Sequence, residues 1–105
     1  MTREEFLKLI SSKDTPIETL IDLAKSEDTP SEFLIELAKY RKWKVRYEVA
    51  CNPKSPIEAL EILSDDKVER VWRAVGGNPS TPQEIHIKLS VKFFSVGNRI
   101  KKKKT

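Results

Sequence analysis

The feature that most constrains this chain is a repeat of 26 residues. The stretch from Asn52 to Ser64 returns, 26 positions later, as the stretch from Asn78 to Ser90. Between residues 45 and 90, eight identical pairs fall in this register, among them two valines, an Asn-Pro pair and a leucine followed by serine. A period of this length indicates two-helix units, which cannot bury an apolar face alone and must stack on one another.

Four repeats account for nearly the whole chain, beginning near residues 2, 29, 55 and 81. We expect one domain over residues 1–98 and a flexible basic tail over residues 99–105. The four repeats would span about residues 2–28, 29–54, 55–80 and 81–98. The first is an altered copy, because Ser26 and Glu27 stand where later repeats have asparagine and proline. The pattern predicts a short all-α solenoid.

Each repeat opens with a signature of helix initiation: a hydroxyl residue, then proline, then glutamate two positions further on. In a capping box, the hydroxyl accepts a hydrogen bond from the third helical amide and the glutamate side chain reaches back. Proline is tolerated at the first helical position, where its missing donor is harmless. The predicted caps are Thr29, Ser55 and Thr81, with Thr15 as a further copy and Thr2 as a weaker one without proline.

Counted toward the C-terminus from each predicted cap, the fifth residue is large, the eighth is apolar and the ninth is small. This spacing places the three side chains on one helical stripe, which we expect to form the core. The stripe comprises Leu7, Ile10, Ser11; Leu20, Leu23, Ala24; Leu34, Leu37, Ala38; Leu60, Leu63, Ser64; and His86, Leu89, Ser90. Second helices are predicted over residues 16–25, about 42–51 and 67–76, with a shortened one within 92–97.

These motifs resemble the leucine-rich repeat variant, a relative of HEAT repeats. The third and fourth repeats match best, the second matches from Thr29 onward, and the first is degenerate. The resemblance implies alternating α and short or 3₁₀ helices wound into a right-handed superhelix, with no common activity. Some members bind an iron–sulfur cluster through several cysteines, which does not carry over to a chain with one. The residues that carry the resemblance are Val45-Arg46, Val49-Ala50, Asn52-Pro53, Ser55-Pro56, Leu60 and Leu63.

Composition narrows the class of protein. No apolar run is long enough to span a bilayer and no secretory signal opens the chain, so we expect a soluble cytoplasmic protein. With Cys51 and His86 as the sole cysteine and histidine, an internal disulfide is excluded, and we expect no metal or cofactor. Residues 1–38 hold four basic and nine acidic side chains, a net charge of −5, whereas residues 39–105 carry +9.

A basic and aromatic cluster over residues 39–47 and its counterpart around residue 72 are the main candidates for a binding site. Cations from successive second helices would form a stripe that attracts acidic partners. The candidate partner-binding residues are Arg41, Lys42, Trp43, Lys44, Arg46, Arg70, Trp72, Arg73, Lys92 and Arg99. The competing interpretation places Trp43 in the core, with the lysines as a solvated rim and the terminal lysines as a solubilising end.

The remaining polar residues have structural explanations. Asn52 and Asn78 precede proline at a helix exit, where their side chains can bond local backbone groups in the turn. His86 has no catalytic partner at helical spacing, so we interpret it as a substitution tolerated on a half-exposed last helix. Cys51 is interpreted as a small packing residue. We therefore expect no enzyme.

The sequence favours a non-enzymatic repeat scaffold that mediates protein–protein interaction. The alternative is nucleic-acid binding through phosphate contacts along the basic stripe, with little sequence readout. A third hypothesis is weak head-to-tail self-association, in which the acidic first repeat meets the basic last one. Phe93 and Phe94 either seal the last repeat or offer a docking surface.

Overall fold

The computed structural model describes the backbone of residues 1–104 and the side chains of residues 1–96. Over that backbone the chain is all-α, with helices and no strand. The helices are α1 (Arg3–Ser11), α2 (Ile17–Lys25), α3 (Ser31–Leu37), α4 (Trp43–Cys51), α5 (Ile57–Ser64), α6 (Glu69–Gly77) and α7 (Gln83–Lys104). The candidate Arg99 and the predicted tail over residues 99–105 lie outside the described side chains.

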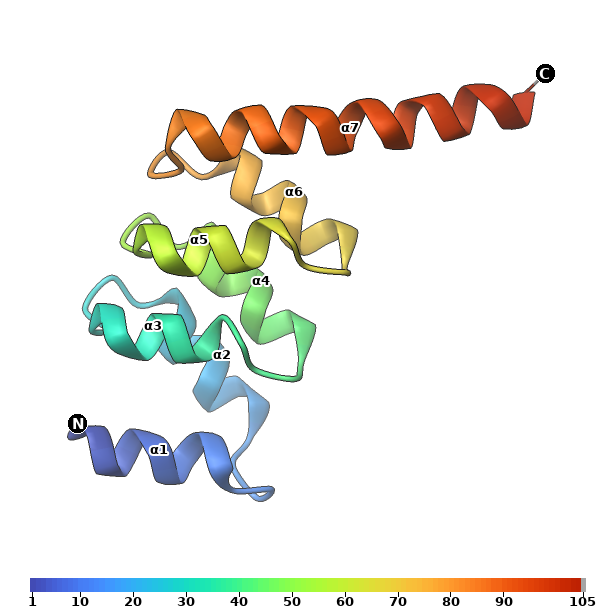
Figure 1. Ribbon diagram of the computed structural model, residues 1–105. Coiled ribbons are helices and arrows are strands. Elements are labelled where there is room, and N and C mark those ends of the chain that lie inside the picture. The colour runs from blue at the N-terminus through green and yellow to red at the C-terminus, as the bar shows by residue number, and fades with distance from the viewer. Residues whose placement is uncertain (105) are drawn as a thin grey trace.

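The helices form an elongated two-layer array (Figure 1). Helices α1, α3, α5 and α7 lie side by side in one layer, and α2, α4 and α6 form the second. The radius of gyration is 15.1 Å, against about 13 Å for a compact domain of this length. Each helix contacts the next one in its own layer, as expected for stacked two-helix units.

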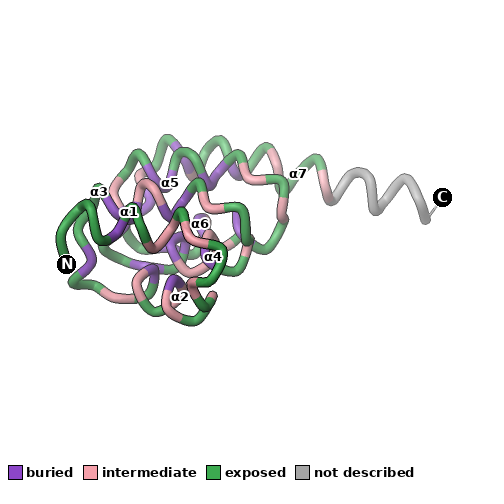
Figure 2. Tube along the Cα trace, turned by 90° about the horizontal axis from the view of Figure 1, so that it is seen from below, coloured by how far each residue is buried: buried purple, intermediate pink, exposed green. Residues whose placement is uncertain are grey.

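The core lies between the two layers (Figure 2). The predicted stripe is confirmed in the middle of the array, where the first layer buries leucines and the second buries valines. The residues fully excluded from solvent there are Leu34, Leu37, Leu60, Leu63, Val45, Val49, Val71 and Val75. The predicted stripe therefore identified the packed faces of α3 and α5, whereas the buried valines of α4 and α6 lie outside it.

At both ends of the array the stripe shifts by one residue. Phe6 is buried in place of Leu7, and its ring stacks on that of Phe33 with 4.1 Å between centroids. In α7, Ile85 is buried whereas His86 is only partly covered. The fourth position after each opening hydroxyl thus belongs to the core, which the predicted pattern overlooked.

The hydroxyl residues that open the repeats do not cap the helices that follow them. Thr29, Ser55 and Thr81 are buried, and each donates a 2.6 Å hydrogen bond to the carbonyl oxygen six residues earlier, at the end of the preceding helix. The prediction of capping boxes at these positions was wrong, because the three hydroxyls bond to the C-terminal end of the preceding helix and not to the N-terminus of the following one. Only Thr2 and Glu5, among the described side chains, form a capping box.

Asparagine side chains join successive repeats. The Asn52 amide donates to the carbonyl oxygens of Ala24 and Ser26 at 2.8 and 2.9 Å. Asn78 repeats the pattern, donating to Ala50 and Asn52 at 2.7 and 2.9 Å. The local turn bonds expected for both residues are also present, because each amide oxygen accepts from the backbone two residues on.

The fourth repeat lacks the second helix predicted within residues 92–97, because α7 continues through this stretch. In the second repeat a turn at residues 38–42 separates the two helices, and residues 65–68 do the same in the third. The corresponding residues 91–94 are Val-Lys-Phe-Phe, and the helix runs through them without a turn.

The second helices are not 3₁₀ segments as the resemblance implied. Helices α2, α4 and α6 are nine-residue α-helices, no shorter than α3 and α5. Bonds of the 3₁₀ type occur only at their ends, as from the Asn52 amide to the Val49 carbonyl. None of the helices within the described backbone is both long and apolar enough to cross a membrane.

Replacing Leu63 or Leu37 with alanine should lower the free energy of unfolding by about 2–5 kcal/mol, because each substitution leaves a cavity in the core. Leu7→Ala is the matched control, since Leu7 is exposed and its truncation should cost far less. Urea denaturation monitored by circular dichroism measures all three. Equal losses at Leu7 and Leu63 would contradict the assignment of the core.

Asn78→Ala should cost about 1–3 kcal/mol, because it leaves the buried carbonyl oxygens of Ala50 and Asn52 without their amide donor. Ser26→Ala provides the comparison, since the Ser26 hydroxyl supports only a local turn to the Asp28 amide. Thermal or urea unfolding of the two variants should show the larger loss at Asn78. A larger loss at Ser26 would argue against the role of the asparagine in joining repeats.

Candidate partner-binding surface

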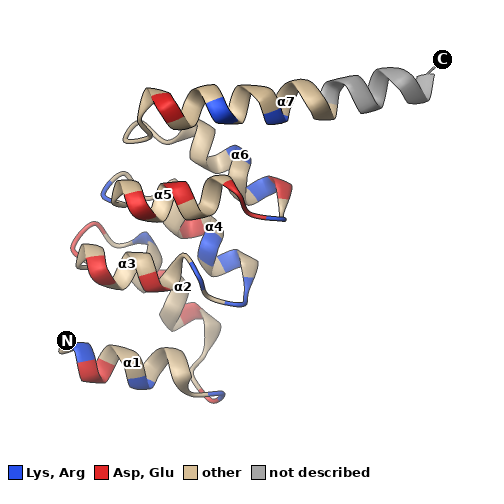
Figure 3. Ribbon diagram, in the orientation of Figure 1, with Lys and Arg blue, Asp and Glu red and all other residues tan. Residues whose placement is uncertain are grey.

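Except for Lys92 and Arg99, whose positions belong to α7, the predicted site residues lie on the α3–α4 turn, α4 and α6, where Figure 3 shows blue segments along one edge of the array. Arg41 and Lys42 occupy the turn between α3 and α4, Lys44 follows on α4, and Arg70 is the second residue of α6. All four side chains are exposed. Three other candidates, Arg46, Trp72 and Lys92, are engaged within the fold.

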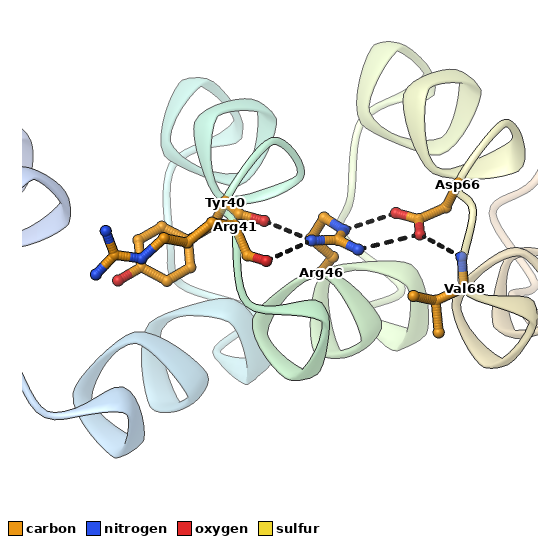
Figure 4. A network of polar contacts seen from close by, with 5 residues as sticks. All are labelled: Tyr40, Arg41, Arg46, Asp66 and Val68. Atoms are coloured by element: carbon orange, nitrogen blue, oxygen red, sulfur yellow. Dashed lines mark hydrogen bonds and ion pairs between the residues drawn. The ribbon is translucent and has the colours of Figure 1, made fainter.

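Arg46 is a structural residue (Figure 4). Its Nε donates to Asp66 Oδ2 at 2.7 Å and its Nη2 to Oδ1 at 3.2 Å, so the pair joins the second repeat to the third. Its Nη1 donates to the carbonyl oxygens of Tyr40 and Arg41, at the end of the α3 turn. The Arg46 side chain is 17% exposed and Asp66 only 7%. Such a pair leaves no guanidinium face for a partner.

Trp72 is also part of the fold, being only 6% exposed at the junction of α6 and α7. The Phe93 ring packs edge-on against it with 5.1 Å between centroids. Lys92 places its ammonium 5.1 Å from the Trp72 ring and donates to the Ser64 carbonyl at 2.6 Å, where it complements the C-terminus of α5. Phe93 therefore seals the last repeat, and neither Trp72 nor Lys92 is free for a partner.

Trp43 is the aromatic candidate that stays partly exposed. It is the first residue of α4 and meets Tyr47, one turn later, edge-on with 6.3 Å between ring centroids. Arg70 reaches across from α6, with its guanidinium carbon 6.0 Å from the Trp43 ring centroid. Trp43, Tyr47 and Arg70 thus form one aromatic and cationic patch shared by two repeats.

Cations surround this patch at repeated positions. Lys67 occupies the place of Arg41 in the next repeat, and Arg70 occupies the place of Lys44, each 26 residues on. We call Arg41, Lys42, Lys44, Lys67 and Arg70 the cationic edge. Within residues 1–96, none of them forms an ion pair. Sequence reasoning missed Lys67, although the 26-residue shift from Arg41 identifies it.

A shallow groove of about 460 Å³ runs between α4 and α6 beside the patch. Arg73 contributes to its wall, with its Nε 2.7 Å from Glu69 Oε2 and its guanidinium over the Phe93 ring. Gly77 lies at one end of the groove, where an added Cβ would meet nothing within 4 Å. The lining residues are Tyr47, Cys51, Arg70, Arg73, Ala74, Gly77 and Asn78.

The first layer exposes acidic residues, which are mixed with basic ones on α1 and α7. Its helices expose a series of glutamates that face solvent, visible as red segments along the front helices of Figure 3. These are Glu4 on α1, Glu32 on α3, Glu58 and Glu61 on α5, and Glu84 on α7. An anionic ligand is therefore attracted to the cationic edge and repelled from the glutamates of α3 and α5.

Cys51 lines the groove as an exposed residue whose thiol is partly desolvated. Burial is the main cause that raises the pKa of the thiol, so the thiolate is scarce at neutral pH. The hydrogen bond with this thiol in turn raises the pKa of the Tyr47 hydroxyl. Among the residues described, no three histidine, cysteine or acidic side chains gather where they could hold a metal ion.

Comparison with known proteins gives no match to a family model, to a curated protein or to a solved structure.

The alkylation of Cys51 by iodoacetamide should be slow at pH 8, because a raised pKa keeps the thiol protonated at a pH where a free cysteine is partly ionised. The midpoint of the rate against pH should lie above the ordinary value of about 8.5. The same protein unfolded in urea is the control and should react faster. A folded-state midpoint at or below that of the unfolded chain would contradict the raised pKa of this thiol.

Proposed function

We propose that this chain is a non-enzymatic repeat scaffold that binds an acidic segment of another protein. In this proposal the helical array is a right-handed solenoid of four 26-residue units, similar to the leucine-rich repeat variant. Recurring hydrogen bonds support the repeat in addition to the amino-acid sequence. The bonds of Asn52 recur at Asn78, and the carbonyl contact of Ser55 recurs at Thr81, each after 26 residues.

The observation that carries the proposed function is the partly exposed Trp43, held between Tyr47 and Arg70. Tryptophan, tyrosine and arginine are the residue types most enriched at the energetic centres of protein interfaces. The three side chains are already ordered by contacts within the fold, so little conformational entropy is lost when a partner covers them.

The cationic edge defines the chemistry of the partner. Lys42 and Lys44 flank Trp43 on the chain, and Lys67 follows in the next turn, so an acidic peptide would meet cations on both sides of the aromatic patch. An apolar or aromatic residue of the same peptide would cover Trp43. In this proposal Trp43 provides affinity through aromatic contact, and the cationic edge speeds association by attracting the acidic peptide.

Nucleic-acid binding is the second candidate, favoured by the lack of ion pairs along the cationic edge within residues 1–96. Phosphate contacts of this kind would need no aromatic anchor and would weaken steeply with salt. We prefer protein binding over nucleic-acid binding because the rings of Trp43 and Tyr47 lie edge to face. This arrangement does not present parallel ring faces on which bases could stack.

The test compares two fluorescent probes by anisotropy: a peptide of glutamates around one central tryptophan, and a single-stranded oligonucleotide of equal charge. Trp43→Ala should weaken peptide binding by about tenfold or more, because it removes the anchor. Replacing Arg41, Lys42, Lys44 and Lys67 with serine should weaken both probes. Arg46 is left unchanged, because removing one partner of its buried ion pair would itself destabilise the fold by about 3–5 kcal/mol.

A control variant, Lys13→Ser, removes an exposed cation from the first repeat, away from the edge, and should leave both affinities unchanged. If the peptide binds equally well to Trp43→Ala and to the wild type, Trp43 is no anchor and the proposed function fails. If the oligonucleotide binds more tightly than the peptide and its affinity falls steeply with salt, the nucleic-acid candidate replaces it.

A further inference from the structure

The outward side of α7 carries an apolar stripe that nothing within residues 1–96 covers. Ile87, Val91 and Phe94 are 61%, 64% and 69% exposed. Their spacing of four and three residues aligns them along one side of the helix, opposite the buried Ile85 and Leu89. Isolated apolar residues are common on protein surfaces, but a row of three large ones marks an interaction surface.

The other end of the array is different. On α1, Phe6 faces inward against Phe33, and the residues on the opposite side of the helix are Glu4, Lys8 and Ser11. All three are exposed and polar, as is usual for the terminal repeat of a solenoid. The N-terminal end is therefore suited to water, whereas the C-terminal end exposes the kind of face that repeats use for stacking.

We propose that a second copy of the chain covers this stripe with its own α7, so that the two helices pack about a two-fold axis. A two-fold interface joins the same patch on both copies and so requires a surface that complements itself. The stripe on α7 meets this requirement, because apolar side chains face apolar side chains. Head-to-tail assembly would instead place the stripe against Glu4 and Lys8.

Charge selects an antiparallel arrangement of the two helices. Helix α7 has Glu84 in its first turn, and its sequence ends with Arg99 and four lysines at residues 101–104. A parallel pair would bring ten cations together, whereas an antiparallel pair separates them and places each Glu84 toward the basic end of the other helix. In the register that best aligns the stripes, Val91 faces Val91 of the second copy and Ile87 faces Phe94.

The expected dimer is weak and depends on concentration. Each copy contributes one helix side with three large apolar residues, and interfaces below about 1,200 Å² belong to transient complexes. The association is separate from the proposed partner site, because the stripe lies on α7 whereas Trp43 lies on α4. Either proposal can fail without the other.

Sedimentation velocity from about 10 µM to about 1 mM tests the association. The weight-average mass of the wild type should rise from 12.1 kDa toward twice that value. Val91→Glu should stay monomeric throughout, with an unchanged circular dichroism spectrum, because Val91 is exposed within the monomer. The matched control is Lys8→Glu, which places the same side chain on the outward side of α1 and should dimerise like the wild type.

A cysteine cross-link tests the geometry. In a Cys51→Ser background, Val91→Cys should form a disulfide-linked dimer under mild oxidation, since residue 91 of each copy meets its counterpart at the two-fold axis. Lys8→Cys in the same background should not. A wild type that remains monomeric at about 1 mM overturns the proposal. The proposal is also overturned if the dimer persists in Val91→Glu or is lost in Lys8→Glu. It is overturned as well if Val91→Cys gives no disulfide-linked dimer.

Discussion

The stacking of this array depends on a hydrogen bond that leaves one repeat and ends in the one before it. Apolar packing pulls the two layers together, but it has no direction and would tolerate small slips between units. The Asn52 amide bonds two carbonyl oxygens of the first repeat, and Asn78 bonds two of the second, so each unit is held at a defined position. A slip would leave buried carbonyl groups unpaired, at about 1–3 kcal/mol each.

Because backbone and small polar groups perform this task, the outward side chains of the second layer are free to differ between repeats. The positions of Lys44 and Arg70 correspond to Glu18 in the first repeat, so the sign of charge changes along the array without altering its packing. The same freedom allows Trp43 to stay partly exposed on α4. The candidate binding surface is thus a product of substitutions at positions that the stacking does not use.

The period and the apolar spacing were enough to predict the helices as far as the start of α7 and the leucines of the central core, because both follow from contacts repeated in every unit. Contacts that occur once could not be predicted in this way. Arg46 and Lys44 look alike in the sequence, and only the arrival of Asp66, twenty residues later, makes one of them structural. Trp43 and Trp72 differ for a similar reason, since Phe93 covers the second and no counterpart covers the first.

The last repeat differs between the two layers of the array. In the 26-residue register, the asparagine of the fourth unit would fall at position 104, which is a lysine and cannot reproduce the two amide donors with their turn acceptor. Within the described backbone, the second layer ends with α6. The first layer continues with α7, which exposes Ile87, Val91 and Phe94. An apolar surface that is exposed on one layer alone favours a closed two-fold dimer over an assembly to which further copies are added.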